Sequence, residues 1–355
     1  MRIALVSDAW APQVNGVVRA LATTAERLRA SGHDVLTITP AKFRTIGCPT
    51  YPEIRLAILP GKRVRRLLNL FAPEAVHLAT EGPLGWAARG WCKRRGQGFT
   101  TSFHTRFPDY VALRTGLPAD LFWPVMRWFH GGAERTFAVT AALADELTGR
   151  GISPVHRWPL GVDLGAFTPD VAPHPAMRDL PRPIQLSVGR VAVEKNLSAF
   201  LDTTVGGTKV VVGDGPALER LKADYPGVLF LGALHGAELA SAYAAADVFV
   251  FPSRTDTFGL VNVEALASGV PVAAYPVRGP LDIVGADGCG LNGGTLRVGA
   301  LDEDLSRAIV VALTADRAAC RAEAARYDWS RCTQAFVAGL ATRRVMAVSG
   351  ALALA

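Results

Sequence analysis

Two carboxylates, Asp256 and Glu264, stand eight residues apart in "SRTDTFGLVNVEALASGVPV", residues 253–272. A strand-like run, 246–252, comes just before them, and helix-forming residues follow. If the helix begins near the Phe-Gly pair, its free N–H groups can hold an anion. The two acids would then accept hydrogen bonds from different hydroxyl-rich parts of one ligand. The alternative makes Asp256 a helix cap and Glu264 a buried acid satisfied by the backbone.

Two cations, Arg190 and Lys195, flank a second strand-to-helix loop, in "SVGRVAVEKNLSAF". Together they could grip a diphosphate, because the arginine offers a planar fork of donors and the lysine a point charge. The alternative is a solvated surface loop in which Glu194 pairs with either cation.

Two further junctions lie in the first half of the chain. In "PQVNGVVRAL", Gly16 precedes an amphipathic helix, so backbone N–H groups there could approach a phosphate; an ordinary turn glycine is the alternative. His104, in "SFHTRFPDY", ends an expected strand, with Arg106 and Tyr110 nearby. A lone histidine is usually a packing or surface residue, but its position at the carboxyl end of a strand favours a functional role.

Other motifs predict structure rather than chemistry. The turn "VVGDGP" is not GxGxxG, and no GxxxxGK[ST] occurs, which disfavours a nicotinamide dehydrogenase or a P-loop enzyme. Acidic residues 302–304, "DED", resemble a metal-binding DxD but open a predicted helix, where acids offset the helix dipole. We interpret these acids as the N-terminal cap of that helix.

Short apolar runs alternate with helical patterns along the whole chain, which predicts parallel sheets built from βαβ units. The expected fold class is α/β, with two Rossmann-like doubly wound domains facing across a cleft that holds the ligand. The predicted divisions are an N-terminal domain at 1–168, a proline-rich linker at 169–183 and a C-terminal domain at 184–330. A helix at about 331–355 is expected to pack back onto the first domain.

The excess positive charge lies in the first half. Residues 1–170 carry 21 Lys and Arg against 13 Asp and Glu, a net charge of +8, and the remainder carries −1. This favours an anionic partner for the first domain. Segments 61–70, with its cations beside leucines, and 117–132, with its tryptophans, resemble interfacial segments, or else form a solvated basic face and a buried helix.

The five cysteines show no CxxC or metal-type spacing, which is typical of reduced thiols in a cytoplasmic protein. The first residues predict a β-strand rather than a signal peptide, and no apolar window is long enough to span a membrane. We expect a cytoplasmic protein, peripheral on the inner face of the membrane.

Taken together, these clusters resemble the retaining glycosyltransferases of family 4, which have the GT-B fold. The resemblance rests on the order and spacing of motifs along nearly the whole chain: "PQVNGV", "SFHTRFP", "GRVAVEKN", "VVGDGP", "TDTFGLVNVEALASGVPV" and "YDWSRCTQAF". Within that family the chain is most similar to the bacterial α-mannosyltransferase and sulfoquinovosyl-lipid synthase branch, chiefly through "PQVNGV" and "TDTFG".

The resemblance implies roles for individual residues. The implied donor-binding set is Gly16, Arg190, Lys195, Asp256, Phe258, Gly259, Leu260, Val261 and Glu264. Arg190 and Lys195 would hold the diphosphate, and Glu264 the ribose. Asp256 and the backbone of 258–261 would hold the transferred sugar, with Gly16 facing the phosphates.

The implied catalytic set is His104, Asp256, Arg190 and Lys195. His104 would contact the sugar or stabilise charge at the reacting carbon. Many members have Glu where this chain has Asp256, one methylene shorter, which puts the preferred sugar in question. The acceptor candidates are Trp10, Arg106 and Tyr110.

The implied activity is metal-independent transfer of a hexose, mannose or a glucose-type sugar, from a nucleotide-diphosphate sugar to a lipid or glycan hydroxyl. No cofactor or metal is expected, an anionic membrane surface is a candidate partner, and nucleic acid is not. The alternatives are a nucleotide-sugar epimerase of the same fold and a non-catalytic protein that binds nucleotide sugars or membrane surfaces.

Overall fold

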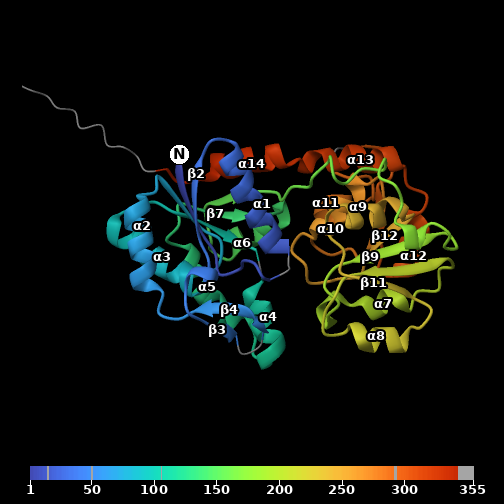
Figure 1. Cartoon of the computed structure of the whole chain (residues 1–355), viewed down its shortest axis with the longest axis horizontal. Helices are drawn as coiled ribbons and strands as arrows, with labels where there is room; N and C mark the ends of the chain where they lie inside the picture. Colours follow the sequence, from blue (N-terminus) through green and yellow to red (C-terminus); the bar gives the residue numbers. More distant parts are fainter. Residues whose placement is uncertain (14–15, 49–50, 105, 292–293, 343–355) are drawn as a thin grey trace, which may run out of the picture.

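The computed structural model describes residues 1–13, 16–48, 51–104, 106–291 and 294–342. Figure 1 shows two α/β domains side by side, each built around a parallel sheet of six strands. The first sheet has the order β2-β1-β5-β6-β7-β8. Its strands are β1 (Arg2–Val6), β2 (Asp34–Ile38), β5 (Ala75–Leu78), β6 (Thr100–Phe103), β7 (Arg135–Ala138) and β8 (Val155–Arg157).

Helices cover both faces of this sheet, and the same domain has a separate two-stranded antiparallel hairpin. The helices are α1 (Gly16–Ala30), α2 (Gly61–Phe71), α3 (Pro83–Arg95), α4 (Phe107–Thr115), α5 (Trp123–His130) and α6 (Ala141–Gly149). The hairpin consists of β3 (Thr45–Cys48) and β4 (Tyr51–Ala57). Because both faces are covered, β5 and β6 are buried along their whole length, although β6 consists largely of Thr and Ser.

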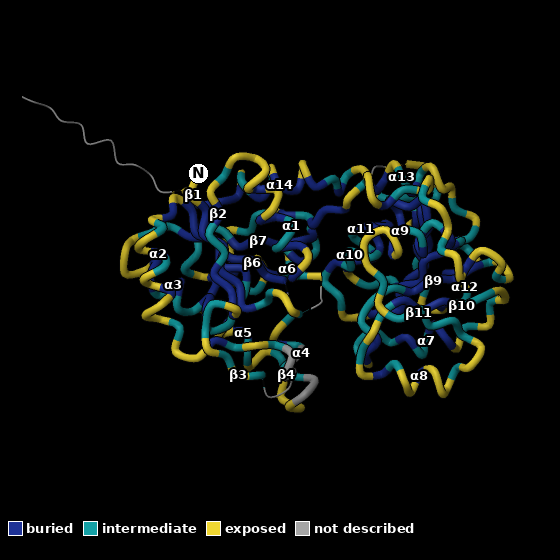
Figure 2. The backbone as a smooth tube through the Cα atoms, in the orientation of Figure 1, coloured by how far each residue is buried: buried dark blue, intermediate teal, exposed yellow. Residues whose placement is uncertain are grey.

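The second sheet has the order β11-β10-β9-β12-β13-β14. Its strands are β9 (Ile184–Val188), β10 (Thr208–Val212), β11 (Leu229–Gly232), β12 (Val248–Phe251), β13 (Val272–Ala274) and β14 (Gly299–Leu301). Its helices are α7 (Leu197–Leu201), α8 (Leu218–Asp224), α9 (Gly236–Ala245), α10 (Leu260–Ala267), α11 (Leu281–Val284), α12 (Leu305–Ala312) and α13 (Arg317–Ala324). Figure 2 shows that the buried backbone is concentrated in the two sheets.

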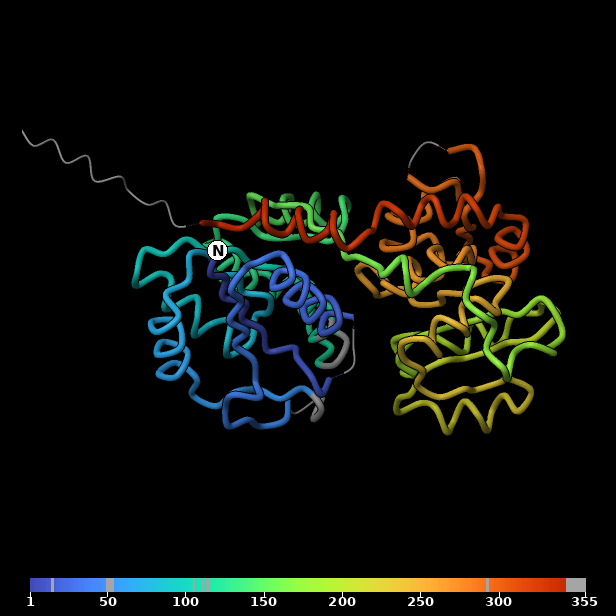
Figure 3. Tube along the Cα trace, turned by 45° about the horizontal axis from the view of Figure 1, so that its top comes forward, coloured from blue at the N-terminus to red at the C-terminus, as the bar shows by residue number. Residues whose placement is uncertain are grey.

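The chain crosses between the domains twice, and the two crossings are bonded to each other. The Val162 N–H donates to the Tyr327 carbonyl at 2.7 Å, next to the start of the last helix, α14 (Trp329–Gly339). Figure 3 shows α14 running from the second domain back along the first. There the Arg135 guanidinium donates to the Gly339 carbonyl at 3.0 Å. Residues 343–355 of the expected C-terminal helix lie outside the described residues.

The predicted α/β fold class is confirmed. Every strand that the apolar runs predicted lies in one of the two parallel sheets. The sequence did not predict the β3–β4 hairpin or the edge strands β8 and β14, which have three residues each. The segment 169–183 packs on the second domain, where the His174 N–H donates to the Ser241 carbonyl at 3.0 Å.

The predicted cap at 302–304 is present. The Asp304 carboxylate accepts hydrogen bonds from the N–H groups of Ser306, at 2.9 Å, and Arg307, at 3.4 Å, at the start of α12. Both donors would otherwise lack a partner within the helix.

We predict that Asp304→Ala lowers the free energy of unfolding by about 1 kcal/mol, because two helix-terminal N–H groups lose their acceptor. Asp304→Asn keeps an oxygen in place and should stay close to the wild type. Urea unfolding of the three proteins measures the difference. An alanine variant as stable as the wild type would contradict the capping role.

Candidate functional site

The four donor-side residues are gathered by the pairing of two strands. β12 lies next to β9 in parallel register, so the loops that follow these strands emerge at the same edge of the sheet. Arg190 follows β9, and Lys195 ends the short 3₁₀ turn η4 (Val193–Lys195). Asp256 lies between β12 and α10, and Glu264 lies within α10.

Lys195 and Asp256 form an ion pair with each other. The Lys195 ammonium contacts both carboxylate oxygens of Asp256, at 2.6 and 2.7 Å, and both side chains are about one-quarter exposed. The sequence assigned these residues to separate parts of a ligand and did not predict their contact. Because the pair is accessible, a ligand's phosphate and hydroxyl groups can compete for it.

The Arg190 loop lies against the glycine turn of "VVGDGP". The Val191 N–H donates to the Asp214 carbonyl at 2.9 Å. A Cβ at Gly213 would lie 1.8 Å from the Gly189 carbonyl oxygen, so a side chain cannot be accommodated there. The turn therefore shapes the loop that carries Arg190, in agreement with its predicted structural role. Arg190 itself lies 3.9 Å from the Glu194 carboxylate, the partner named in the alternative.

The helix α10 begins without a side-chain cap. Its N-cap is Gly259, which has φ of 80°, and a Cβ there would lie 2.6 Å from the Asn262 amide nitrogen. Phe258 is buried beside this turn. Asp256 is thus not the cap that the alternative proposed, and among the described residues no side chain caps the N-terminus of α10.

Glu264 is buried, and both of its carboxylate oxygens have side-chain partners. Arg19, on α1 of the other domain, donates to Oε1 at 2.5 Å, and the Tyr243 hydroxyl donates to Oε2 at 3.0 Å. The charge of Glu264 raises the pKa of Arg19. Burial, and then the same carboxylate, raise the pKa of Tyr243 well above its ordinary value. The alternative of a carboxylate satisfied by the backbone is therefore wrong.

His104 follows β6 on the opposite wall and is buried. Its backbone carbonyl accepts a hydrogen bond from the Thr257 hydroxyl at 3.1 Å, which joins it to the loop of Asp256. Its Nε2 has no partner among the described residues. Burial lowers the pKa of His104 to about 4, so the imidazole is neutral near pH 7. Its Nε2 can then form one hydrogen bond with a ligand.

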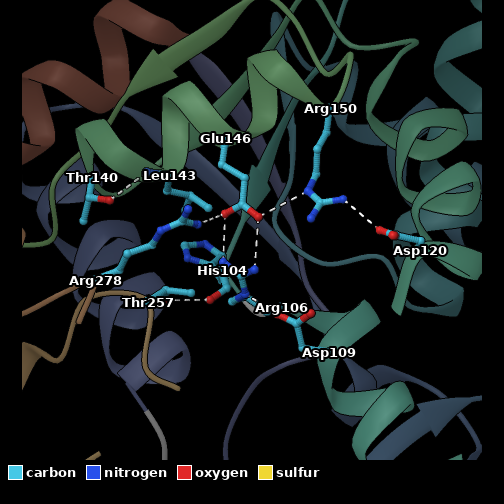
Figure 4. Close-up of polar contacts among 10 residues, drawn as sticks. All are labelled: His104, Arg106, Asp109, Asp120, Thr140, Leu143, Glu146, Arg150, Thr257 and Arg278. Carbon is cyan, nitrogen blue, oxygen red and sulfur yellow. Dashed lines mark hydrogen bonds and ion pairs between the residues drawn. The ribbon is translucent and has the colours of Figure 1, made fainter. Parts of the chain in front are cut away.

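Arg106 belongs to a charged cluster that spans the domains, drawn in Figure 4. The Glu146 carboxylate accepts from Arg106 at 2.8 and 3.0 Å, from Arg150 at 3.2 Å, and from Arg278 of the second domain. Burial pushes the pKa of Glu146 up, but its bonds to Arg106 and the charges of Arg106 and Arg278 outweigh this and lower it. Arg106 also pairs with Asp109.

The remaining predicted residues of the first domain are Gly16, Trp10 and Tyr110. Gly16 is the first residue of α1, and its backbone faces Leu260, whose Cδ1 would lie 3.8 Å from a Cβ at this position. Trp10 is half-buried and packs on the core. The backbone of Tyr110 lies in α4, but its side chain, like residues 14–15 of the first motif, is outside the described residues.

Sequence reasoning missed four residues of this site: Arg19, Tyr243, Glu146 and Arg278. The position of Arg19, three residues after Gly16 on an amphipathic helix, was a usable signal, since residues so spaced lie on one helical face. Glu146 and Arg278 are 132 residues apart, and no local pattern links them. The described part of the chain holds no cluster of three His, Cys, Asp or Glu side chains suited to a metal ion.

Two family models match the chain, one for each domain. The model for glycosyltransferase family 4 matches residues 14–166, and that for group 1 glycosyl transferases matches residues 182–314. A GDP-mannose-dependent alpha-mannosyltransferase of Mycobacterium tuberculosis is 34% identical over 87% of both chains. The sulfoquinovosyl transferase SQD2 of Arabidopsis thaliana is 30% identical over 86% of this chain and 66% of its own.

Solved structures of glycosyltransferases have the same fold. Sucrose-phosphate synthase from Thermosynechococcus elongatus superposes with a TM-score of 0.72 at 22% identity, covering 95% of this chain and 97% of its own. Anabaena HepE in complex with UDP-glucose gives a TM-score of 0.69 at 15% identity, covering 95% and 98%. These likenesses confirm the GT-B architecture that the sequence predicted.

We predict that His104 makes the protein less stable in mild acid. The unfolded histidine has a pKa of 6.5 and the folded one about 4, so the unfolded chain binds the proton more tightly. The stability present above pH 6.5 is therefore lost as the pH falls toward 4. Between pH 7 and pH 5 the loss from this residue should be about 2 kcal/mol.

Urea unfolding of the wild type and His104→Gln at both pH values measures this. The glutamine variant should lose about 2 kcal/mol less than the wild type between pH 7 and pH 5. Buried groups whose pKa does not depend on His104, such as Asp8, contribute equally to both proteins and cancel in the comparison. Parallel pH profiles for the two proteins would contradict the prediction.

Proposed function

This chain belongs to glycosyltransferase family 4, and we propose on that basis that it is a retaining, metal-independent hexosyltransferase. The donor is a nucleoside-diphosphate sugar carrying mannose or a glucose-type sugar, and the acceptor is a hydroxyl of a lipid or glycan. The observation that carries the proposal is the convergence of Arg190, Lys195, Asp256 and Glu264 at one sheet edge, opposite His104.

The names of the relatives support the choice of donor and acceptor. Those 30 to 34% identical include GDP-mannose-dependent alpha-mannosyltransferases and a sulfoquinovosyl transferase. An alpha-monoglucosyldiacylglycerol synthase of Streptococcus pneumoniae is 26% identical over 78% of this chain. GDP-mannose and UDP-glucose are therefore the first donors to test, and a lipid hydroxyl is the first acceptor.

In the proposed complex the positive groups of the second domain meet the diphosphate. Arg190 offers a fork of donors and Lys195 an ammonium, and the open N-terminus of α10 adds N–H groups with a positive dipole end. Glu264 accepts hydrogen bonds from the ribose hydroxyls. These cations and dipoles supply the charge compensation that a divalent metal provides in other enzymes.

In the proposed reaction the acceptor oxygen attacks the anomeric carbon from the face that the diphosphate leaves. The carbon–oxygen bond to the diphosphate breaks, the new glycosidic bond forms on the same face, and the acceptor proton passes to a diphosphate oxygen. No protein nucleophile takes part. The growing negative charge on the diphosphate is stabilised by Arg190 and Lys195.

Asp256 and His104 hold the transferred sugar in this scheme. The Lys195 ammonium lies against Asp256. Asp256 would accept a hydrogen bond from a sugar hydroxyl while Lys195 contacts a phosphate, so the ion pair would set the position of the sugar relative to the diphosphate. The neutral His104 imidazole, with Nε2 unpartnered among the described residues, supplies one further hydrogen bond to a sugar hydroxyl.

We predict that Lys195→Ala lowers turnover by about 10²-fold or more, because a charged contact to the leaving group contributes about 2–4 kcal/mol to transition-state binding. Lys222→Ala is the matched control, since Lys222 is an exposed lysine of the same domain. Purified protein is assayed with GDP-mannose or UDP-glucose and lipid extract, with and without EDTA. Near-normal activity of Lys195→Ala would contradict the proposed role of Lys195 in stabilising the leaving diphosphate.

The same assay separates the alternatives. Epimerisation or hydrolysis of the donor without an acceptor would favour the epimerase or another donor-modifying activity. Binding of a nucleotide sugar without turnover, measured by calorimetry, would favour the non-catalytic alternative. Loss of transfer in EDTA, restored by Mg²⁺, would contradict the metal-independent mechanism.

We also propose that the first domain lies on an anionic membrane surface. The helix α2 buries Val64 and Leu68 and exposes Lys62, Arg65 and Arg66 to solvent. In the segment 117–132, Leu121, Val125 and Trp128 recur at helical spacing and are all exposed, at 61%, 46% and 62%. No helix in the described part of the chain is long and apolar enough to cross a membrane.

We predict that Lys62→Ala/Arg65→Ala/Arg66→Ala weakens binding to vesicles containing phosphatidylglycerol by about 10²-fold, since each cation contributes about 1 kcal/mol at an anionic surface. Co-sedimentation at low and high salt measures the effect. Arg178→Ala/Arg220→Ala/Lys222→Ala removes the same charge from exposed positions elsewhere and should bind normally. Equal loss in both triple variants would show that net charge, not α2, controls binding.

A further inference from the structure

The ion pair between Arg19 and Glu264 joins the two domains at the donor side of the cleft. The Glu264 side chain is 3% exposed, whereas that of Arg19 is 47% exposed. A buried carboxylate needs a compensating charge, and here that charge comes from a helix of the opposite domain. The second domain alone therefore does not complete the surroundings of Glu264.

The pair leaves Glu264 able to accept further hydrogen bonds. A carboxylate has about four lone-pair positions, and Arg19 and Tyr243 use one on each oxygen. The second position on each oxygen would then accept the two neighbouring hydroxyls of a ribose. Arg19 and a ribose can thus contact the same carboxylate at the same time.

The position of Arg19 on α1 links this contact to Gly16. The two residues are one helical turn apart, so they move together as parts of a rigid element. Gly16 faces Leu260, the first residue of α10, and Glu264 lies one turn further along that same helix. When Arg19 contacts Glu264, the start of α1 is placed against the start of α10.

The surroundings of the pair allow it to break and form again. It borders a cavity of about 230 Å³ lined by polar and charged side chains of α1, among them Thr23, Glu26 and Arg27, and by Asp163 and Trp329. This cavity lies beside the crossing at Gly161 and Val162, around which the domains are joined. Because Arg19 is half-exposed, its separation from Glu264 uncovers little apolar surface.

We propose that Arg19 is a positioning residue for sugar transfer. On domain closure it binds Glu264, holds that carboxylate in the orientation that accepts the ribose, and places Gly16 beside the donor phosphates. Arg19 itself touches neither the sugar nor the reacting atoms. This inference rests on the proposed function, since it assigns Glu264 to the ribose of a nucleotide sugar.

A positioning role predicts a particular kinetic pattern. The donor diphosphate first meets Arg190 and Lys195, which both belong to the second domain, so its initial binding does not require α1. Arg19 acts afterwards, when the domains close and the phosphates meet Gly16. Its loss should therefore lower kcat much more than it raises the KM for the donor.

The test compares four proteins in transfer from GDP-mannose or UDP-glucose. We expect Arg19→Ala to lower kcat about 10- to 100-fold, with the donor KM within about threefold of the wild type. Arg19→Lys, which keeps the charge, should recover part of kcat. Arg27→Ala is the matched control, because Arg27 is on the same helix, is equally exposed and lies 4.0 Å from the half-exposed Asp163; it should stay within about twofold.

A double variant tests whether Arg19 acts through Glu264. Arg19→Ala/Glu264→Gln should be no slower than Glu264→Gln alone, since Arg19 then has no charge left to position. Additive losses would overturn the proposal, because they would mean that Arg19 acts on the donor directly. The proposal would also be overturned if Arg19→Ala were as active as Arg27→Ala, or if Arg19→Ala changed only the donor KM.

The failure of the proposed function would show itself separately. If the wild type neither binds nor turns over GDP-mannose or UDP-glucose, the kinetic assay fails for every protein, and the proposed function with it. Urea unfolding of Arg19→Ala, Glu264→Gln and the double variant still measures the contact. If the changes in the free energy of unfolding are not additive, the contact contributes only to stability. If they are additive, the pair contributes nothing. Either result overturns the positioning role.

Discussion

The parallel pairing of β9 with β12 is the constraint on which the donor side of the molecule depends. These strands are 60 residues apart in sequence, yet their carboxyl ends lie side by side, with Phe249 opposite Leu186. The loop with Arg190 and Lys195 therefore meets the loop with Asp256. Without this pairing the cations and the acids would be separate surface features, and no single ligand could reach both.

The charges of the cleft are compensated by one another. Lys195 is bound to Asp256, Glu264 to Arg19, and Glu146 to three arginines. Partly buried charges are costly unless they are paired, and each charged side chain proposed to bind the ligand has a protein partner in this structure. A charged donor would compete with these partners or share them rather than fill an empty charged surface, which favours ligands that bring both phosphate and hydroxyl groups.

Among the described residues, polar contacts join the two domains near the proposed ligand groups, alongside the approach of Leu260 to Gly16. Thr257 to His104, Arg278 to Glu146 and Arg19 to Glu264 each join one side chain to the opposite wall. The crossings, in contrast, bury Trp329 and Phe167 in a core that continues into both domains. This difference suits a hinge at the crossings and a cleft whose walls can separate, because polar contacts at the wall can be replaced by water.

The sequence by itself determined the fold class, the edge of the sheet where the proposed ligand groups gather, and the cap at Asp304. These follow from local patterns: apolar runs of strand length, glycine turns before helices, and an acid at a helix start. It also identified Arg190, Lys195, Asp256 and Glu264 as candidates, since each lies at or near a strand-to-helix junction.

Only the tertiary structure decided which charges meet. Arg19 and Glu264 are 245 residues apart, and Arg278 and Glu146 are 132 apart. A local pattern reports whether a position is buried, but it does not report what faces that position across a boundary between domains, because that depends on how two separately folded units pack.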